Sequence, residues 1–126
     1  MIAIATEAIT KAEKSSQIRI IEGDALDTWI HLIRLSLTCS LPTLHGPFDI
    51  IFIDADKKDY IEYFDMIMER KLLAQDGIIV ADNVLAHGST ADSNSKANNA
   101  KDSAELRKFN DHIAEVILLS HEKKKE

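Results

Sequence analysis

Three short segments that contain polar residues each follow a run of apolar residues. They are Gly23-Asp24-Ala25, Asp54-Ala55-Asp56-Lys57 and Asp82-Asn83. Apolar runs of this kind are typical of buried parallel strands, and open α/β sheets bind their ligands beyond the carboxyl ends of the strands. Carboxylate and amide oxygens suit Mg²⁺ or another oxygen-preferring divalent ion. These groups are therefore the first candidates for a metal or ligand site.

Each acidic group also has other interpretations. An Asp at a strand end can simply cap the helix or turn that follows it. The segment after Asp54 does not fit a calcium loop of the EF-hand kind, because Lys58 takes a ligand position and Asp59 the glycine position. An apolar strand that ends in Asp54-x-Asp56 also resembles the metal site of nucleotide-sugar glycosyltransferases. A metal-dependent glycosyl or phosphoryl transferase therefore stays open at this point.

The elements that would position these groups alternate between helix and strand. Helices are predicted at Thr6–Lys14, Leu26–Leu37, Ile61–Met68 and Leu106–Ile113, and strands at Ile18–Ile21, Phe48–Ile53, Ile78–Ala81 and Val116–Leu119. Strict alternation predicts a parallel α/β sheet with right-handed crossovers. The polar segment 87–103 has no apolar period and predicts a long loop. Residues 120–126 form a charged tail.

Composition limits the classes of partner. With 126 residues, 45% of them apolar, and a net charge of -6, the chain fits a single globular domain without a nucleic-acid surface. Cys39 is the only cysteine, which excludes an intramolecular disulfide and favours the cytoplasm. The N-terminal apolar run is too short to span a bilayer, so neither a signal peptide nor a membrane span is predicted.

Residues 48–89 resemble the core of the catechol and caffeoyl-CoA O-methyltransferases, class I enzymes that use S-adenosylmethionine (SAM) and a divalent metal. The resemblance depends on Asp-Ala-Asp-Lys at 54–57 and Ala-Asp-Asn-Val-Leu at 81–85, and it extends to Gly-Asp-Ala-Leu at 23–26 and Phe109-Asn110. It implies a Rossmann-like SAM-methyltransferase fold of the α/β class, with a mostly parallel sheet and flanking helices.

The resemblance also implies roles for individual residues. Asp54, Asp82 and Asn83 would bind Mg²⁺, or another divalent cation such as Ca²⁺ or Mn²⁺, and Lys57 would be the general base. A metal that holds both oxygens of a vicinal diol lowers the pKa of the reacting hydroxyl, and a lysine whose own pKa the cation lowers can take the proton. The implied reaction transfers the methyl group of SAM to a hydroxyl of a catechol-like or phenolic small molecule, either free or linked to CoA.

Further residues are assigned to the cofactor and to packing. Asp24 and Ala25 match the adenine-side contact of the family, with helix capping by Asp24 as the alternative. Asp54 is also expected beside the cofactor. Tyr60 is interpreted as a packing residue, with a place in the wall of the pocket as the alternative.

Part of the family's pattern does not occur in this sequence. The glycines at 23, 46, 77 and 88 cannot form the family's Glu-x-Gly-x-x-x-Gly turn. The chain is therefore expected to be N-terminally truncated and to lack the first, central strand with its Gly-rich turn. The strand edges exposed by this loss predict a homodimer or strand exchange. Two interpretations follow: a partial methyltransferase domain from an active parent, or a catalytically inactive binding or regulatory relative that keeps the metal half.

Overall fold

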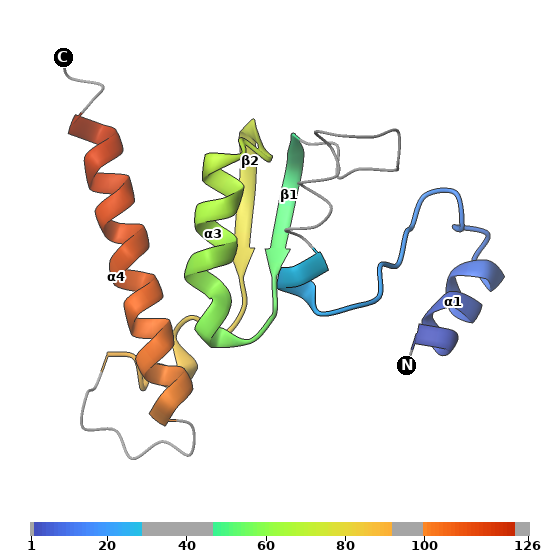
Figure 1. Ribbon diagram of the computed structural model, residues 1–126, viewed down its shortest axis with the longest axis horizontal. Helices are drawn as coiled ribbons and strands as arrows, with labels where there is room; N and C mark the ends of the chain where they lie inside the picture. Colours follow the sequence, from blue (N-terminus) through green and yellow to red (C-terminus); the bar gives the residue numbers. More distant parts are fainter. Residues whose placement is uncertain (1, 29–46, 92–99, 123–126) are drawn as a thin grey trace. The chain divides into compact units, whose positions relative to one another are not determined.

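The computed structural model describes residues 2–28, 47–91 and 100–122 (Figure 1). The chain forms two compact units, Met1–Leu44 and His45–Glu126. None of the helices in the described ranges is long and apolar enough to cross a membrane. The prediction of a single partial domain stays a prediction.

The first unit begins with helix α1 (Ile2–Lys11), which has no buried residue. The helix ends earlier than predicted, because Glu13 adopts a left-handed backbone with φ 56°. The N–H groups of Glu13 and Lys14 donate to the backbone oxygens of Thr10 and Ile9, each at 3.0 Å. This pair of bonds is a Schellman motif, which satisfies the last carbonyl groups of the helix.

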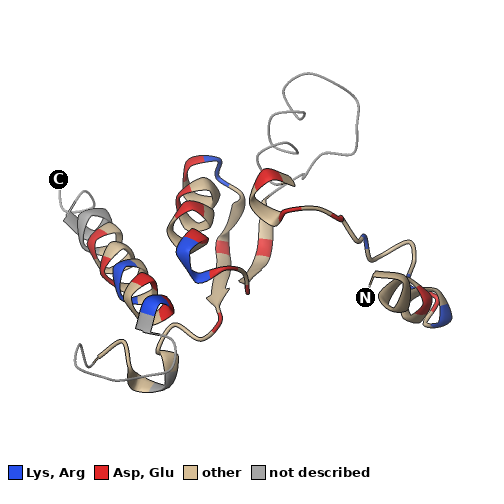
Figure 2. Cartoon of the chain, turned by 60° about the horizontal axis from the view of Figure 1, so that its bottom comes forward, with Lys and Arg blue, Asp and Glu red and all other residues tan. Residues whose placement is uncertain are grey.

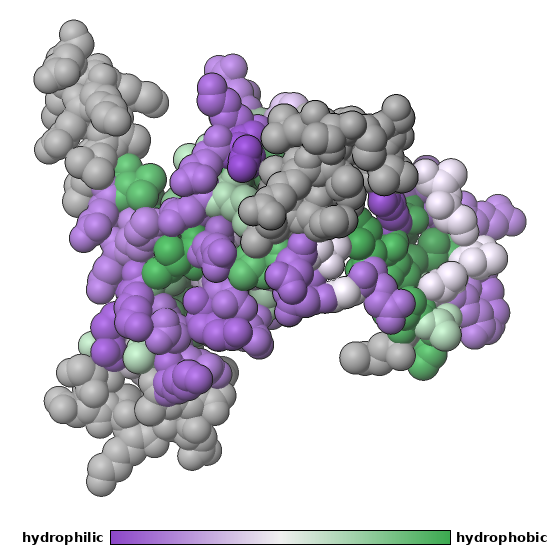
Figure 3. Space-filling model, viewed as in Figure 1, coloured by the Kyte–Doolittle hydropathy of each residue, from purple (hydrophilic) through white to green (hydrophobic). Residues whose placement is uncertain are grey.

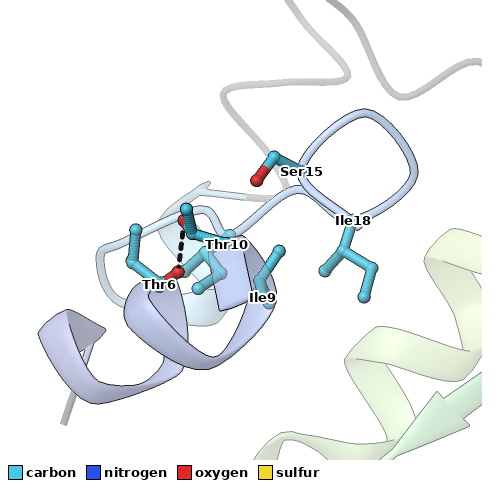
Figure 4. A pocket seen from close by; sticks show the side chains of 6 residues that line it. Thr6, Ile9, Thr10, Ser15 and Ile18 are labelled. Carbon is cyan, nitrogen blue, oxygen red and sulfur yellow. Dashed lines mark hydrogen bonds between the residues drawn. The ribbon is translucent and has the colours of Figure 1, made fainter. Parts of the chain in front are cut away.

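The strand predicted at Ile18–Ile21 is wrong, because the described chain is irregular there and its isoleucines are largely exposed. A strand forms only where a neighbour supplies hydrogen-bond partners, and β-branched residues alone do not replace that neighbour. Ile18 instead lines a pocket of ≈ 250 Å³ against α1, together with residues that include Thr6, Thr10 and Ser15 (Figure 4). The lining has no charged residue and contains none of the predicted site residues.

The second unit contains a parallel pair of strands, β1 (Phe48–Ile53) and β2 (Leu73–Ala81). Their register shifts between Phe48, which faces Leu73, and Ile50, which faces Ile78. Residues 75–77 therefore lie in a bulge, and the strand begins earlier than the predicted Ile78–Ala81. Beyond the bulge the pairing is regular up to Ile53 and Ala81, so the carboxyl ends of both strands lie at one edge.

Between the strands the chain forms the 3₁₀ turn η1 (Lys57–Asp59) and helix α3 (Tyr60–Glu69), close to the predicted helix. Its buried residues are Tyr60, Tyr63, Phe64 and Ile67, spaced three and four apart as on one helical stripe. Met68, the last residue of the predicted helix, is exposed. A second Schellman motif ends α3 at Lys71, whose φ is 53°.

The C-terminal part consists of a short 3₁₀ turn, η2 (Ala86–Gly88), and the long helix α4 (Ala100–Glu122). The strand predicted at Val116–Leu119 is wrong, because these residues continue α4. Their apolar positions keep the helical spacing of Leu106, Phe109 and Ile113, and the described chain offers no further strand for them to pair with. The helix predicted at Leu26–Leu37 begins at Ala25, and the part from residue 29 lies outside the described residues.

The core of this unit lies on one face of the strand pair. Helix α3 runs alongside β2, and α4 packs against α3 and η1 (Figures 1 and 2). Ile51 and Ile53 point into this core, whereas Ile50 and Phe52 on the opposite face are 67% and 62% exposed. Apolar atoms reach the surface between hydrophilic ones in the region of α3 and the strands (Figure 3). The interpretation of this apolar run as a buried strand is thus wrong for one face of β1 within the described residues.

Candidate active site at the strand ends

Asp54 and Asp82 occupy equivalent positions on neighbouring strands. Ile53 and Ala81 face each other in the parallel register, and each aspartate directly follows one of them. The backbone N–H of Asp82 donates to the oxygen of Ile53 at 2.9 Å, so the ladder continues to the first residue beyond the strands. The structure therefore brings the two predicted carboxylates to adjacent strand ends, as the sequence predicted.

Asn83 follows at the start of the turn that leaves β2. Its φ of 58° lies in the left-handed region, which Asn tolerates better than most residues do. The backbone oxygen of Asn83 accepts the N–H of Ala86 at 2.8 Å, and this bond closes the turn. Asn83 is exposed to solvent.

Lys57 begins η1, just after the Asp54 strand end. Its Nζ lies 3.5 Å from Oδ1 of Asp54, and its side chain is only 16% exposed, against 57% for Asp54. The same Nζ donates a hydrogen bond to the hydroxyl of Tyr60. Figure 2 shows basic residues in blue at the start of α3. The predicted base thus lies beside a predicted metal ligand.

Tyr60 joins this amine to the backbone of both strands. The residue is 0% exposed, and its hydroxyl lies 3.1 Å from the backbone oxygen of Asp82 and 3.3 Å from that of Ile53. Its ring meets the Phe109 ring edge-on, with centroids 5.3 Å apart. The packing interpretation is confirmed for the ring. The role of the hydroxyl was missed, because it depends on how α3 is placed against the register of the strands.

The pKa of Lys57 is raised above its usual value. Burial, the largest single influence, lowers the pKa, but the hydrogen bond and electrostatic attraction of Tyr60, together with Asp54, outweigh it. The amine is therefore charged at neutral pH in the protein without a metal ion. The expected depression of this pKa requires a cation that the chain itself does not supply.

The turn after Asn83 is fastened to α4. Arg107 donates from Nε to the backbone oxygen of Thr90 at 2.9 Å and from a terminal nitrogen to that of Ser89 at 3.3 Å. The hydroxyl groups of Ser89 and Ser103, both buried residues, lie 2.6 Å apart. The side-chain amide of Asn110 also donates a hydrogen bond to the backbone oxygen of Val84. The sequence placed Ser89 and Ser103 in the predicted loop 87–103, and Arg107 and Asn110 in the predicted helix Leu106–Ile113. The loop prediction is wrong for Ser103, which lies in α4, and the sequence identified none of these contacts.

The donor set at the strand ends suits a hard divalent cation. Two carboxylates and one amide oxygen are available from Asp54, Asp82 and Asn83, and the contact with Lys57 uses only Oδ1 of Asp54. Within the described ranges, no group of three or more His, Cys, Asp or Glu residues could hold a metal ion. A site at this edge would therefore depend on the amide of Asn83, and its occupation by a metal stays a prediction.

Asp24 and Ala25 belong to the first unit. Oδ1 of Asp24 accepts the backbone N–H groups of Leu26 and Asp27, each at 3.1 Å. The capping interpretation of Asp24 is thus confirmed. A contact of Asp24 or Ala25 with the cofactor stays a prediction, as does their position relative to Asp54.

Comparisons with known proteins agree with these features. The sequence profile described as O-methyltransferase matches residues 1–118. O-methyltransferase ankF of Aspergillus thermomutatus is 42% identical over 94 residues, 75% of this chain and 35% of that protein. Catechol O-methyltransferase of Niastella koreensis is 40% identical over 93 residues, 74% of this chain and 38% of that protein.

Among solved structures, the SAH-bound methyltransferase PaMTH1 of Podospora anserina superimposes with a TM-score of 0.70 and 31% identity. The match covers 90% of this chain and 47% of that one, and it confirms the predicted fold class. The chain spans 35% and 38% of the two curated relatives above. A profile match over most of the residues favours this family over a glycosyl or phosphoryl transferase. The chain belongs to the O-methyltransferase family.

Proposed function

We propose that this chain, or a longer protein that contains it, transfers a methyl group from SAM to a hydroxyl of a small phenolic molecule with the help of a divalent cation. The observation that carries the proposal is the pairing of Ile53 with Ala81. This pairing places Asp54 and Asp82 at adjacent strand ends, with the amine of Lys57 3.5 Å from Asp54.

The residues at the carboxyl ends of β1 and β2 have different proposed roles in the reaction. Asp54, Asp82 and Asn83 would hold the cation, preferably Mg²⁺, and SAM would supply the methyl group. When bound, the cation lowers the pKa of a hydroxyl in contact with it and of a nearby lysine amine. Lys57 would first release its own proton to solvent and, as the neutral amine, would then accept the hydroxyl proton at Nζ. Asp54, 3.5 Å from this nitrogen, would keep the amine at the strand ends.

The names of the relatives support the acceptor class. The relative from Niastella koreensis is named a catechol O-methyltransferase, and one from Petroselinum crispum is named a caffeoyl-CoA O-methyltransferase. A catechol-like acceptor fits the proposed site chemically, because two neighbouring oxygens can share one hard cation. Location in the cytoplasm and a homodimer remain predictions.

The test is methyl transfer from labelled SAM to catechol, measured with Mg²⁺ and with a chelator. We expect product with Mg²⁺ only, and a loss of at least about 100-fold in Asp82→Ala, since removal of a ligand removes the charge stabilisation of the site. Asp76→Ala is the matched control, because Asp76 is an exposed aspartate in the bulge of the same strand.

Two results would contradict the proposal. One is methyl transfer that is unchanged by the chelator, and the other is an Asp82→Ala variant as active as Asp76→Ala. If the unmodified protein binds Mg²⁺ but transfers no methyl group, the inactive binding relative becomes the better account.

A further inference from the structure

The hydroxyl of Tyr60 lies where the two strand ends meet. The backbone oxygens within its reach belong to Asp82 at 3.1 Å and Ile53 at 3.3 Å, the last residues before Asn83 and Asp54 respectively. Each of these oxygens belongs to the peptide group that leads into a proposed ligand. A single buried side chain therefore contacts both backbone segments that carry the site.

The same hydroxyl accepts a hydrogen bond from Nζ of Lys57. This nitrogen also lies 4.5 Å from the centroid of the Tyr60 ring, within the range of a cation–π contact. The neighbouring Lys58 provides a comparison. Its side chain is 60% exposed, and its nearest acidic partners, Asp59 and Asp56, lie 3.6 Å and 3.9 Å away. Of these two lysines, only Lys57 has an amine near Tyr60 and the strand-end residue Asp54.

The donors and acceptors match in number. A phenol has one hydrogen to donate, which serves the carbonyl of Asp82 or that of Ile53, and its oxygen can accept from the ammonium of Lys57. Phenylalanine at this position would keep the ring but lose both connections. The amine would then keep only the face of the ring and Asp54, whose side chain is 57% exposed, and it would have no hydrogen bond to a buried group.

We propose that Tyr60 is a positioning residue, whose buried hydroxyl holds the Lys57 amine at the carboxyl ends of β1 and β2. The inference depends on the proposed function only for the use of that amine as a base. Tyr60 does not touch the reacting atoms and acts through Lys57. Its ring has a separate, structural role against Phe109, at a centroid distance of 5.3 Å.

The variant Tyr60→Phe separates the two roles, because it keeps the ring and removes the hydroxyl. Carbon-13 NMR of the lysine Cε groups in the full chain is the measurement, with Lys57→Arg to assign the signal. We expect the Lys57 signal to differ from that of exposed Lys58 in the unmodified chain. In Tyr60→Phe it should move to the Lys58 position while the backbone amide spectrum is kept.

A purely structural Tyr60 would leave the Lys57 signal unmoved in a folded Tyr60→Phe variant, and that result overturns the proposal. If Tyr60→Phe does not fold, substitutions of the two lysines test the same contact from the other side. Lys57→Met should shift the Cζ resonance of Tyr60, and the control Lys58→Met should not. An unshifted Tyr60 resonance in Lys57→Met overturns the proposal as well.

These measurements need neither SAM nor a metal ion, so their outcome is independent of whether the chain transfers methyl groups. In a protein that does, Tyr60→Phe should lower kcat about tenfold and leave the KM of the acceptor unchanged, because a displaced base affects the transition state more than binding. A change in KM alone would assign Tyr60 to acceptor binding instead and overturn the positioning role.

Discussion

The side-chain amide of Asn110 on α4 donates a hydrogen bond to the backbone oxygen of Val84 at 2.9 Å. Val84 directly follows Asn83, the proposed amide ligand, which has a left-handed backbone and begins the turn. A helix distant in sequence thereby fixes the backbone of the turn that carries part of the proposed metal site.

Asn110→Ala should therefore weaken Mn²⁺ binding by about 10-fold or more, the usual effect of losing a group that orients a metal ligand. Water proton relaxation during a Mn²⁺ titration measures the affinity. Asp111→Ala, an exposed neighbour on the same helix, is the control and should bind like the unmodified chain. Equal affinities of the two variants would contradict a supporting role of Asn110.

Arg107 ties the turn at Ser89 and Thr90 to α4. We expect Arg107→Met to destabilise the fold by about 1.5–3 kcal/mol, since it removes hydrogen bonds from a charged donor to two backbone oxygens. Hydrogen exchange should become faster at the amides of residues 89–91. Lys108→Met, at a 63% exposed side chain, should change neither quantity. Unchanged exchange in Arg107→Met would show that the turn does not depend on this contact.

Phe109 lies at the centre of the core, 1% exposed, between the rings of Tyr60 and Phe64. Its replacement by Ala should cost about 3–5 kcal/mol of unfolding free energy, because the substitution leaves a cavity. Urea denaturation followed by circular dichroism measures the loss. Ile117→Ala, at a 50% exposed position of α4, should cost far less. Similar costs for the two variants would refute the described core.

Gly77 lies in the bulge of β2, where a Cβ atom would come within 2.9 Å of the backbone oxygen of Phe48 and 2.8 Å of Leu73. We expect Gly77→Ala to destabilise the chain by about 1–3 kcal/mol, as for other overpacked sites. The neighbouring Gln75→Ala, at an exposed residue, is the control in the same denaturation experiment. A Gly77→Ala variant as stable as the unmodified chain would show that the strands pair without this close approach.

Features defined by local sequence were predictable. The apolar run of β1 and the amphipathic spacing of α3 identified both elements, and the polar residues after the strands identified the candidate site. The strands predicted at Ile18–Ile21 and Val116–Leu119 were wrong. A strand is stabilised by its neighbour, and local sequence does not show whether a neighbour is present.

Contacts between distant segments could not be predicted from the sequence. The hydroxyl of Tyr60 meets the oxygen of Asp82 only because α3 packs against a sheet in one particular register. A buried tyrosine at the start of an amphipathic helix looks the same in sequence whether or not its hydroxyl has this partner. The same holds for Asn110 and the turn at Val84.

Paramagnetic broadening of the amide spectrum by Mn²⁺ tests the central claim most directly, namely that the ends of β1 and β2 form one cation site. At low Mn²⁺ we predict selective loss of the signals of residues 54–57 and 82–84. This loss should be abolished in Asp82→Ala and retained in Asp76→Ala. Broadening that spreads over the other acidic residues of the chain, or that persists unchanged in Asp82→Ala, would contradict the account.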